Sequence, residues 1–262
     1  MKRNAIIKCC ILDMKRAFFS WKSIAGIIGV FLMMLLASME SRQWQLSVLN
    51  SFSYVVYSMP FLLTLIFTTF VYGQSFCEDT VYHYSRLIII RTDLKTYVFS
   101  KILSIMVSSI AVMTGGMLLF VLALRLNYPW IDLMEGTYET LVDSGSFRGL
   151  LEQRQFFLYY LFCGIQYGIY AGILAIAAAM FSLLYHDTLF VLSVPLVLRY
   201  CIDYFSSAIS RDARWNLAKI YDISYNVWDN DVLSFLYACL VAVLLSTALG
   251  YAIYRILKRQ GV

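Results

Sequence analysis

The stretch that decides the fold runs from residue 97 to residue 124 and reads YVFSKILSIMVSSIAVMTGGMLLFVLAL. Its only charged residue is Lys101. A helix needs about 20 predominantly apolar residues to cross the hydrocarbon core of a bilayer. This stretch exceeds that length, so it predicts a transmembrane helix.

The composition of the whole chain agrees with that prediction. Of its 262 residues, 61% are hydrophobic and only 14% are charged, whereas about 25% of the residues of a soluble domain are charged. The mean hydropathy is +0.71. We therefore expect an all-α polytopic membrane protein that forms a single transmembrane domain over residues 1–262.

Six apolar stretches are long enough to be membrane spans. A turn at Tyr185-His186-Asp187-Thr188 divides what would otherwise be one very long stretch into two. The first span follows several basic residues and lacks a small-residue cleavage site, so we expect it to be retained rather than removed as a signal peptide. The predicted spans are Ile24–Met39, Tyr54–Tyr72, Tyr97–Leu124, Phe156–Tyr185, Thr188–Ala208 and Leu233–Leu257.

The distribution of charge predicts the orientation. If the N-terminus is cytoplasmic, most Lys and Arg residues lie inside and most acidic residues lie outside, as the positive-inside rule requires. Both termini should then be cytoplasmic, in a plasma membrane. The net charge of +5 is explained by this orientation and does not indicate nucleic-acid binding.

Three segments outside the spans have distinct characters. Residues 1–22 alternate basic and apolar residues, which is typical of an interfacial helix. Residues 127–155 and 209–230 are expected to form extracellular loops. Pro60 and Pro195 lie inside predicted spans, where proline can kink a helix.

The sequence contains no recognisable catalytic or metal-binding motif. Its two histidines, His83 and His186, are far apart in the sequence, and its six cysteines form no CxxC pair. A Walker A motif requires Gly-Lys, and the chain has no such dipeptide. We therefore expect no enzymatic activity and no cofactor in this chain.

Two ridges of small residues recur at four-residue spacing. Such ridges allow transmembrane helices to approach closely. They could form static packing within the bundle, or they could form a moving interface or a subunit interface, and the sequence leaves these alternatives open. The ridges consist of Gly164, Gly168 and Gly172 in the fourth span, and of Ala238, Ala242, Ser246 and Gly250 in the sixth.

Arg199 and Asp203 stand four residues apart in the outer half of the fifth span. This spacing allows an ion pair across one helical turn. A charge at this depth usually pairs or lines a wet cavity. The two residues could be an exit-side polar pair or an ion pair that ends the span.

A charged, helix-like insert separates the second and third spans, from Phe76 to Lys101. It begins with Glu78 and Asp79 and ends with basic residues, an arrangement that a helix dipole favours. The run Thr92-Asp93-Leu94-Lys95 is typical of a cap that leads into the third span. A short amphipathic helix in this position could fill a groove on a partner protein or could be an ordinary solvated loop.

Together, the six spans, the N-terminal helix and this insert resemble the membrane subunit of an ABC-2 type transporter. The motif that carries the resemblance is GQSFCED at residues 73–79, then RLIIIR at 86–91 and YVFSKIL at 97–103. The resemblance implies that residues 76–96 include a coupling helix which docks on a separate ATPase subunit. The implied contact residues are Phe76, Glu78, Asp79, Tyr82, Arg86 and Leu87. It also implies that the region Tyr225–Trp228 corresponds to extracellular re-entrant helices.

The resemblance implies an exporter permease in which ATP and Mg²⁺ bind only to the partner ATPase. A second permease copy or a related permease would complete the pathway, surrounded by membrane lipid. The aromatic content of 16% favours an amphipathic peptide, a lipid-like molecule or a drug as cargo, and antimicrobial-peptide resistance as the role. The alternatives are a gradient-driven transporter or channel and a membrane scaffold or sensor that transports nothing.

Overall fold

The computed structural model describes residues 2–40, 47–81, 93–132, 136–185, 187–209, 212 and 214–259. The fold is all-α, as the sequence predicts. Its helices are α1 (Lys2–Phe18), α2 (Trp21–Glu40), α3 (Val48–Tyr57), α4 (Met59–Tyr72), α5 (Ser75–Val81), α7 (Leu94–Arg125), α8 (Thr137–Ser144), α9 (Arg148–Glu152), α10 (Phe156–Ser182), α11 (Thr188–Ile209), α12 (Leu217–Ile220) and α13 (Asp231–Arg259).

Within the described residues, six helical segments are long and apolar enough to cross a membrane, so the chain is a multi-pass membrane protein. They are Trp21–Glu40, Met59–Asp79, Leu94–Arg125, Phe156–Ser182, Thr188–Ser206 and Asp231–Arg259. Each corresponds to one predicted span. The predicted break before Thr188 is confirmed, because α10 ends at Ser182 and α11 begins at Thr188.

The second span begins later than predicted. Residues 54–57 belong to α3, a separate helix, and Ser58 between α3 and α4 is extended, with φ −78° and ψ 155°. Pro60 occupies the first turn of α4, where its missing N–H costs nothing. The proline therefore starts a helix here and does not kink one.

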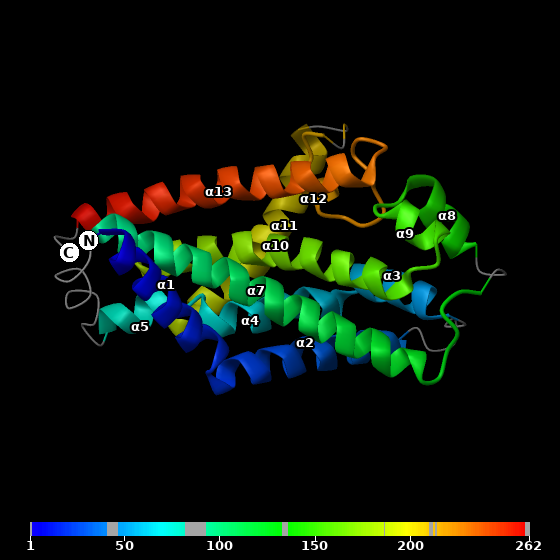
Figure 1. The fold of residues 1–262 in the computed structure, drawn as a ribbon, viewed down its shortest axis with the longest axis horizontal. Coiled ribbons are helices and arrows are strands. Elements are labelled where there is room, and N and C mark those ends of the chain that lie inside the picture. Colours follow the sequence, from blue (N-terminus) through cyan, green and yellow to red (C-terminus); the bar gives the residue numbers. More distant parts are fainter. Residues whose placement is uncertain are drawn as a thin grey trace.

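The helices form an elongated bundle with two distinct ends (Figure 1). The first turns of α1, the short helix α5 and the last turns of α13 lie together at one end, which we call the basal end. Helices α8 and α9 lie at the opposite end, which we call the distal end.

The glycine ridge of α10 packs inside the chain, against α7. A Cβ atom added to Gly168 would lie 2.7 Å from the Cα of Ile110, so the two backbones are in direct contact. Each of the three glycines faces one residue of α7, in the pairs Gly164–Thr114, Gly168–Ile110 and Gly172–Met106. The α10 ridge is therefore buried against α7 within the chain and is not exposed to a second subunit.

The small residues of α13 also face the bundle. Ala238, Ala242, Ser246 and Gly250 are buried, and a Cβ atom on Gly250 would meet Ile102 of α7 at 2.6 Å. The opposite face of α13 exposes large apolar side chains such as Leu236, Leu240 and Leu244. An exposed apolar face of this kind suits contact with lipid tails.

The helix α1 is packed against the bundle as well as being amphipathic. It packs on α7, and its residues Asp13 and Ala17 are buried within the chain, while Ile7, Ile11 and Leu12 are exposed. The interfacial segment expected over residues 1–22 is thus also part of the bundle, because one face of the helix contacts the third span.

The two segments predicted as loops join to form a hydrogen-bonded cap at the distal end. The N–H of Ser146 donates to the carbonyl of Ile223 at 2.7 Å, and the N–H of Asn226 donates to the carbonyl of Ser144 at 2.9 Å. The N–H of Gly149 donates to Asp231 at the start of α13. These bonds tie residues 144–149 to residues 223–231.

The resemblance implies re-entrant helices in the region Tyr225–Trp228, and this prediction is wrong. Tyr225 and Asn226 are irregular, Val227 and Trp228 form a turn, and the only helix of the described residues between α11 and α13 is the four-residue α12. Hydrogen bonds to residues 144–146 and the side chain of Ser234 satisfy backbone groups here, so a helix is not required.

The glycine contact gives a testable prediction. The substitution Gly168→Ala should lower the free energy of unfolding by about 1–3 kcal/mol, because its Cβ would overlap the backbone of α7. Thermal unfolding in detergent measures the effect. Gly115→Ala is the matched control, because its Cβ would meet Ile27 at an ordinary 3.5 Å. Equal stability of the two variants would contradict the close contact.

Candidate functional site

A lysine and two carboxylates are buried together at the basal end. The Nζ of Lys101 on α7 lies 2.8 Å from the Oδ2 of Asp79 on α5 and 3.5 Å from the Oδ1 of Asp13 on α1. The side chains are 1%, 7% and 6% exposed, respectively. We call these three residues the basal ion cluster.

Hydroxyl groups complete the cluster. The hydroxyl of Tyr72 donates to Asp13 at 2.8 Å, and that of Ser100 donates to the other oxygen of the same carboxylate. The hydroxyl of Tyr97 donates to Asp79 at 2.9 Å. Both carboxylates therefore receive hydrogen bonds as well as the charge of Lys101, which is what stabilises buried ions.

The local structure explains how these groups meet. Ser100 and Lys101 follow Tyr97 by three and four residues in α7, so helical spacing places them on neighbouring positions of one face. Tyr72 ends α4, and the turn at Gly73 sets α5 off from it, which brings Asp79 back toward α7. The site thus joins α1, α4, α5 and α7.

The arrangement suits mechanical connection better than catalysis. Removing one partner of a buried ion pair leaves an uncompensated charge, a change that typically costs about 3–5 kcal/mol. The helices that supply the cluster are consequently held in register with one another. Among the described residues, no group of three or more His, Cys, Asp and Glu side chains could hold a metal ion.

A cavity of about 380 Å³ lies beside the cluster and is lined by Asp79 and Lys101 together with Arg16, Lys22 and Glu78. Lys22 at the start of α2 forms an ion pair with Glu78 of α5. Their side chains are 31% and 48% exposed, so this pair is accessible to solvent, whereas the basal ion cluster is not.

Two of the implied ATPase contacts need correction. Phe76 is fully buried and packs edge-on against the ring of Tyr97, with centroids 5.8 Å apart. Asp79 is buried and forms an ion pair with Lys101. Both side chains hold α5 against α7 and do not face a partner, because α5 turns this side toward the bundle. Glu78 is exposed, and Tyr82, Arg86 and Leu87 lie outside the described residues.

The sequence interpretation missed several members of this site. It placed Asp13 only within the interfacial segment of residues 1–22 and Lys101 only at the end of the charged insert, and it gave no role to Tyr72, Tyr97 or Ser100. One signal was present: a lysine inside an apolar helix needs a partner, because an unpaired charge in the membrane is costly. The sequence did not indicate which acidic residues supply it.

A second polar cluster lies nearer the distal cap. Arg199 and Asp203 form the predicted ion pair, at 2.9 Å, and the Arg199 guanidinium lies over the ring of Tyr170 at 4.9 Å. A small cavity of about 30 Å³ is lined by Arg199 and also by Tyr57 and Asp222. Arg199 therefore borders the same cavity as Asp222 of the distal cap, so the pair does more than end α11.

Asp222 belongs to that cap. The hydroxyl of Tyr57 donates to its Oδ1 at 2.5 Å, and the N–H of Ser224 donates to the same atom at 3.0 Å. Burial raises the pKa of Asp222 above its usual range, and the two hydrogen bonds offset this only in part.

No family model, curated protein or solved structure matches this chain. The function must therefore be argued from the geometry of the chain itself.

The basal ion cluster leads to a stability prediction. Lys101→Met should lower the free energy of unfolding by about 3–5 kcal/mol, because two buried carboxylates lose their counter-charge. Adding Asp13→Asn and Asp79→Asn should recover most of that loss. Thermal or denaturant unfolding in detergent provides the measurement.

The matched control is Lys95→Met, which removes an exposed lysine from the same helix and should cost far less. If the triple variant were no more stable than Lys101→Met, pairing with these carboxylates would not explain the role of Lys101.

Proposed function

We propose that this chain is the membrane permease subunit of an ATP-driven exporter of the ABC-2 type, in the plasma membrane, with the basal end cytoplasmic. The observation that carries the proposal is the buried connection of α5 to the spans. The short helix α5, at the basal end of the second span, is joined by Asp79 and Lys101 to the third span, and through Lys101 to Asp13 of α1.

In this proposal a separate ATPase subunit docks beside α5, on the side that exposes Glu78. ATP binding and hydrolysis in that subunit move α5. Since Asp79 is buried against Lys101, α7 moves with α5, and α1 and α4 follow through Asp13 and Tyr72. The partner thereby shifts the population between conformations of the bundle.

A second permease, identical or related, completes the pathway. The cargo we propose is an amphipathic peptide, a lipid-like molecule or a drug, exported in the manner of resistance to antimicrobial peptides. Support comes from the aromatic content of 16% and from the buried charges of the described residues, Asp13, Asp79 and Lys101, which all lie at the basal end and leave the middle of the bundle without a buried charge.

Affinity purification from the membranes of the native host in mild detergent tests the partner. We expect a nucleotide-binding subunit to co-purify with the tagged chain. Recovery of the chain alone, or with proteins that bind no nucleotide, would remove the basis for an ATP-driven exporter and would favour a gradient-driven transporter or a scaffold.

Charge reversal locates the contact. Glu78→Lys should reduce the co-purified ATPase at least several-fold, because its carboxylate is 48% exposed and so remains accessible to a partner beside its ion pair with Lys22. Glu152→Lys, at the exposed distal end, is the control and should leave the yield unchanged.

The double variant Lys22→Glu/Glu78→Lys separates two explanations. It restores the ion pair within the chain but keeps the reversed charge on α5. If the loss persists, Glu78 contacts the partner. If the yield recovers, Glu78 acts only through Lys22, and the proposed contact is wrong.

A further inference from the structure

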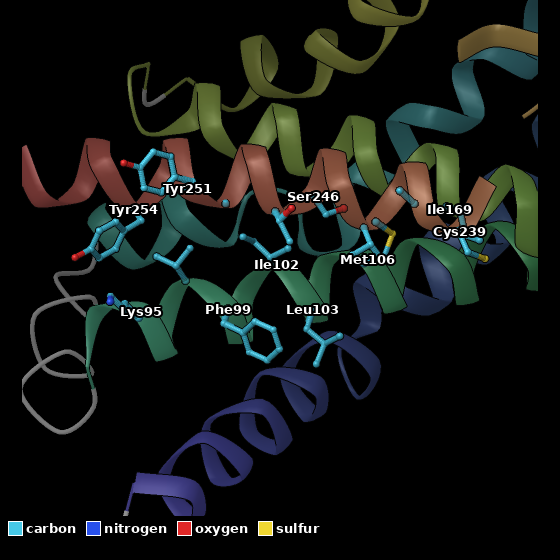
Figure 2. Close-up of a pocket in the computed structure, with 15 residues that line it drawn as sticks. Lys95, Phe99, Ile102, Leu103, Met106, Ile169, Cys239, Ser246, Tyr251 and Tyr254 are labelled. Carbon is cyan, nitrogen blue, oxygen red and sulfur yellow. The ribbon is translucent and has the colours of Figure 1, made fainter. Parts of the chain in front are cut away.

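A long groove opens on the side of the bundle between α7 and α13. Its volume is about 680 Å³, and α10 contributes Ile169 to its lining (Figure 2). Phe99, Leu103 and Met106 line it from α7, and Ala242 and Val243 line it from α13. The groove lies between two membrane-spanning helices, so its opening faces the hydrocarbon region of the bilayer.

The groove is long enough for an acyl chain. At about 1.5 Å per residue, the stretch of α13 from Cys239 to Tyr254 that lines it is about 22 Å long. One leaflet contributes roughly half of the ~30 Å hydrocarbon core. The groove therefore exceeds the thickness of one leaflet. Its hydroxyl-bearing Thr247 bonds to the carbonyl of Leu244 within α13, so that hydroxyl adds little polarity.

The basal end of the groove is basic. Lys95 lines the groove itself, and Figure 2 shows it at the same end as Tyr251 and Tyr254. These two tyrosines also line a neighbouring hollow of about 420 Å³, whose other lining residues are Arg255, Lys258 and Arg259. All four basic residues are exposed. Asp93, two residues before Lys95, is the acidic residue nearest to it in the sequence.

This combination of features matches a phospholipid with a net negative charge. Tyrosines at the end of an apolar surface are typical of the membrane interface, where headgroups lie. Lys and Arg residues just outside a span attract anionic headgroups. A zwitterionic headgroup would gain much less from four cations, because its own ammonium group opposes them.

We propose that the groove between α7 and α13 is a binding site for an anionic phospholipid of the basal leaflet. One acyl chain lies along the groove beside Phe99, Leu103 and Val243, and the phosphate lies between Lys95 and Lys258. The site is independent of the proposed export function, because it requires only the membrane location and the geometry of these two helices.

Native mass spectrometry of the purified full chain tests the site. The protein is mixed with equal amounts of phosphatidylglycerol and phosphatidylcholine that carry the same acyl chains. We expect phosphatidylglycerol adducts to exceed phosphatidylcholine adducts several-fold. Soluble glycerol phosphate should not displace the lipid, because it lacks the acyl chain that fills the groove. Equal adducts of the two lipids would overturn the proposal.

Two pairs of matched variants assign the lipid to this groove. Lys95→Gln/Lys258→Gln should bring the two lipids close to equal binding, whereas Arg125→Gln/Arg154→Gln, which removes two cations at the distal end, should keep the preference. Thr247→Trp should fill the groove mouth and reduce adducts of both lipids. Leu244→Trp, on the exposed face of α13 outside the groove, should not.

The remaining outcomes are also decisive. A preference that survives Lys95→Gln/Lys258→Gln would place the lipid elsewhere, and the proposal would fail. A wild-type chain that carries no lipid but forms a dimer disrupted by Thr247→Trp would show that a second copy occupies the groove.

Discussion

The structure depends most on the pairing of Lys101 with two carboxylates inside an apolar bundle. A lysine seven residues into a membrane-spanning helix can remain charged only if opposite charges and hydroxyl groups replace water. Asp79 and Asp13 supply the charge, and Tyr72, Tyr97 and Ser100 supply hydroxyls. Each group comes from a helix that must be in place for the others to be stable. One electrostatic requirement thereby determines the relative positions of α1, α4, α5 and α7.

The helix α7 is the common element of the features described above. Its basal turns provide Lys101, its middle part contacts the glycine ridge of α10, and another of its faces forms one wall of the lipid groove. A displacement of α5 that reaches α7 through Asp79 would therefore reach the closest helix contact and the groove together. Gly168 contacts Ile110 with no side chain between the two backbones. Close packing of this kind is hard to compress, so a displacement of α7 would be passed to α10.

The two polar clusters have different surroundings and different consequences. The basal ion cluster is closed to solvent and connects helices near an exposed ion pair, Lys22–Glu78. The distal cluster around Arg199 adjoins a cap of loops held by backbone hydrogen bonds, in which Asp222 is buried enough for its pKa to rise. The basal end thus offers a surface on which a partner could act, and the distal end is held by its own loops.

Much of the fold could be predicted from the sequence because membrane spans are set by local composition. The six apolar stretches, the break before Thr188, the start of α7 after Asp93 and the Arg199–Asp203 pair all follow from residues close together in the chain. The non-helical backbone at Tyr225–Trp228 and the separate helix α3 did not follow, because hydrogen bonds to distant segments and one extended residue at Ser58 decide them.

By itself, the sequence determined the fold class, the number of spans and the presence of a charged segment after the second span. Apolar length and helical periodicity are local properties, and the bilayer responds to them directly. Only the tertiary structure decided that Phe76 and Asp79 face inward, that Asp13 joins Lys101 and that the α10 glycines contact α7. These facts depend on which distant helix lies opposite each side chain. Partners of a buried charge are chosen by packing, and no spacing along a single helix specifies them.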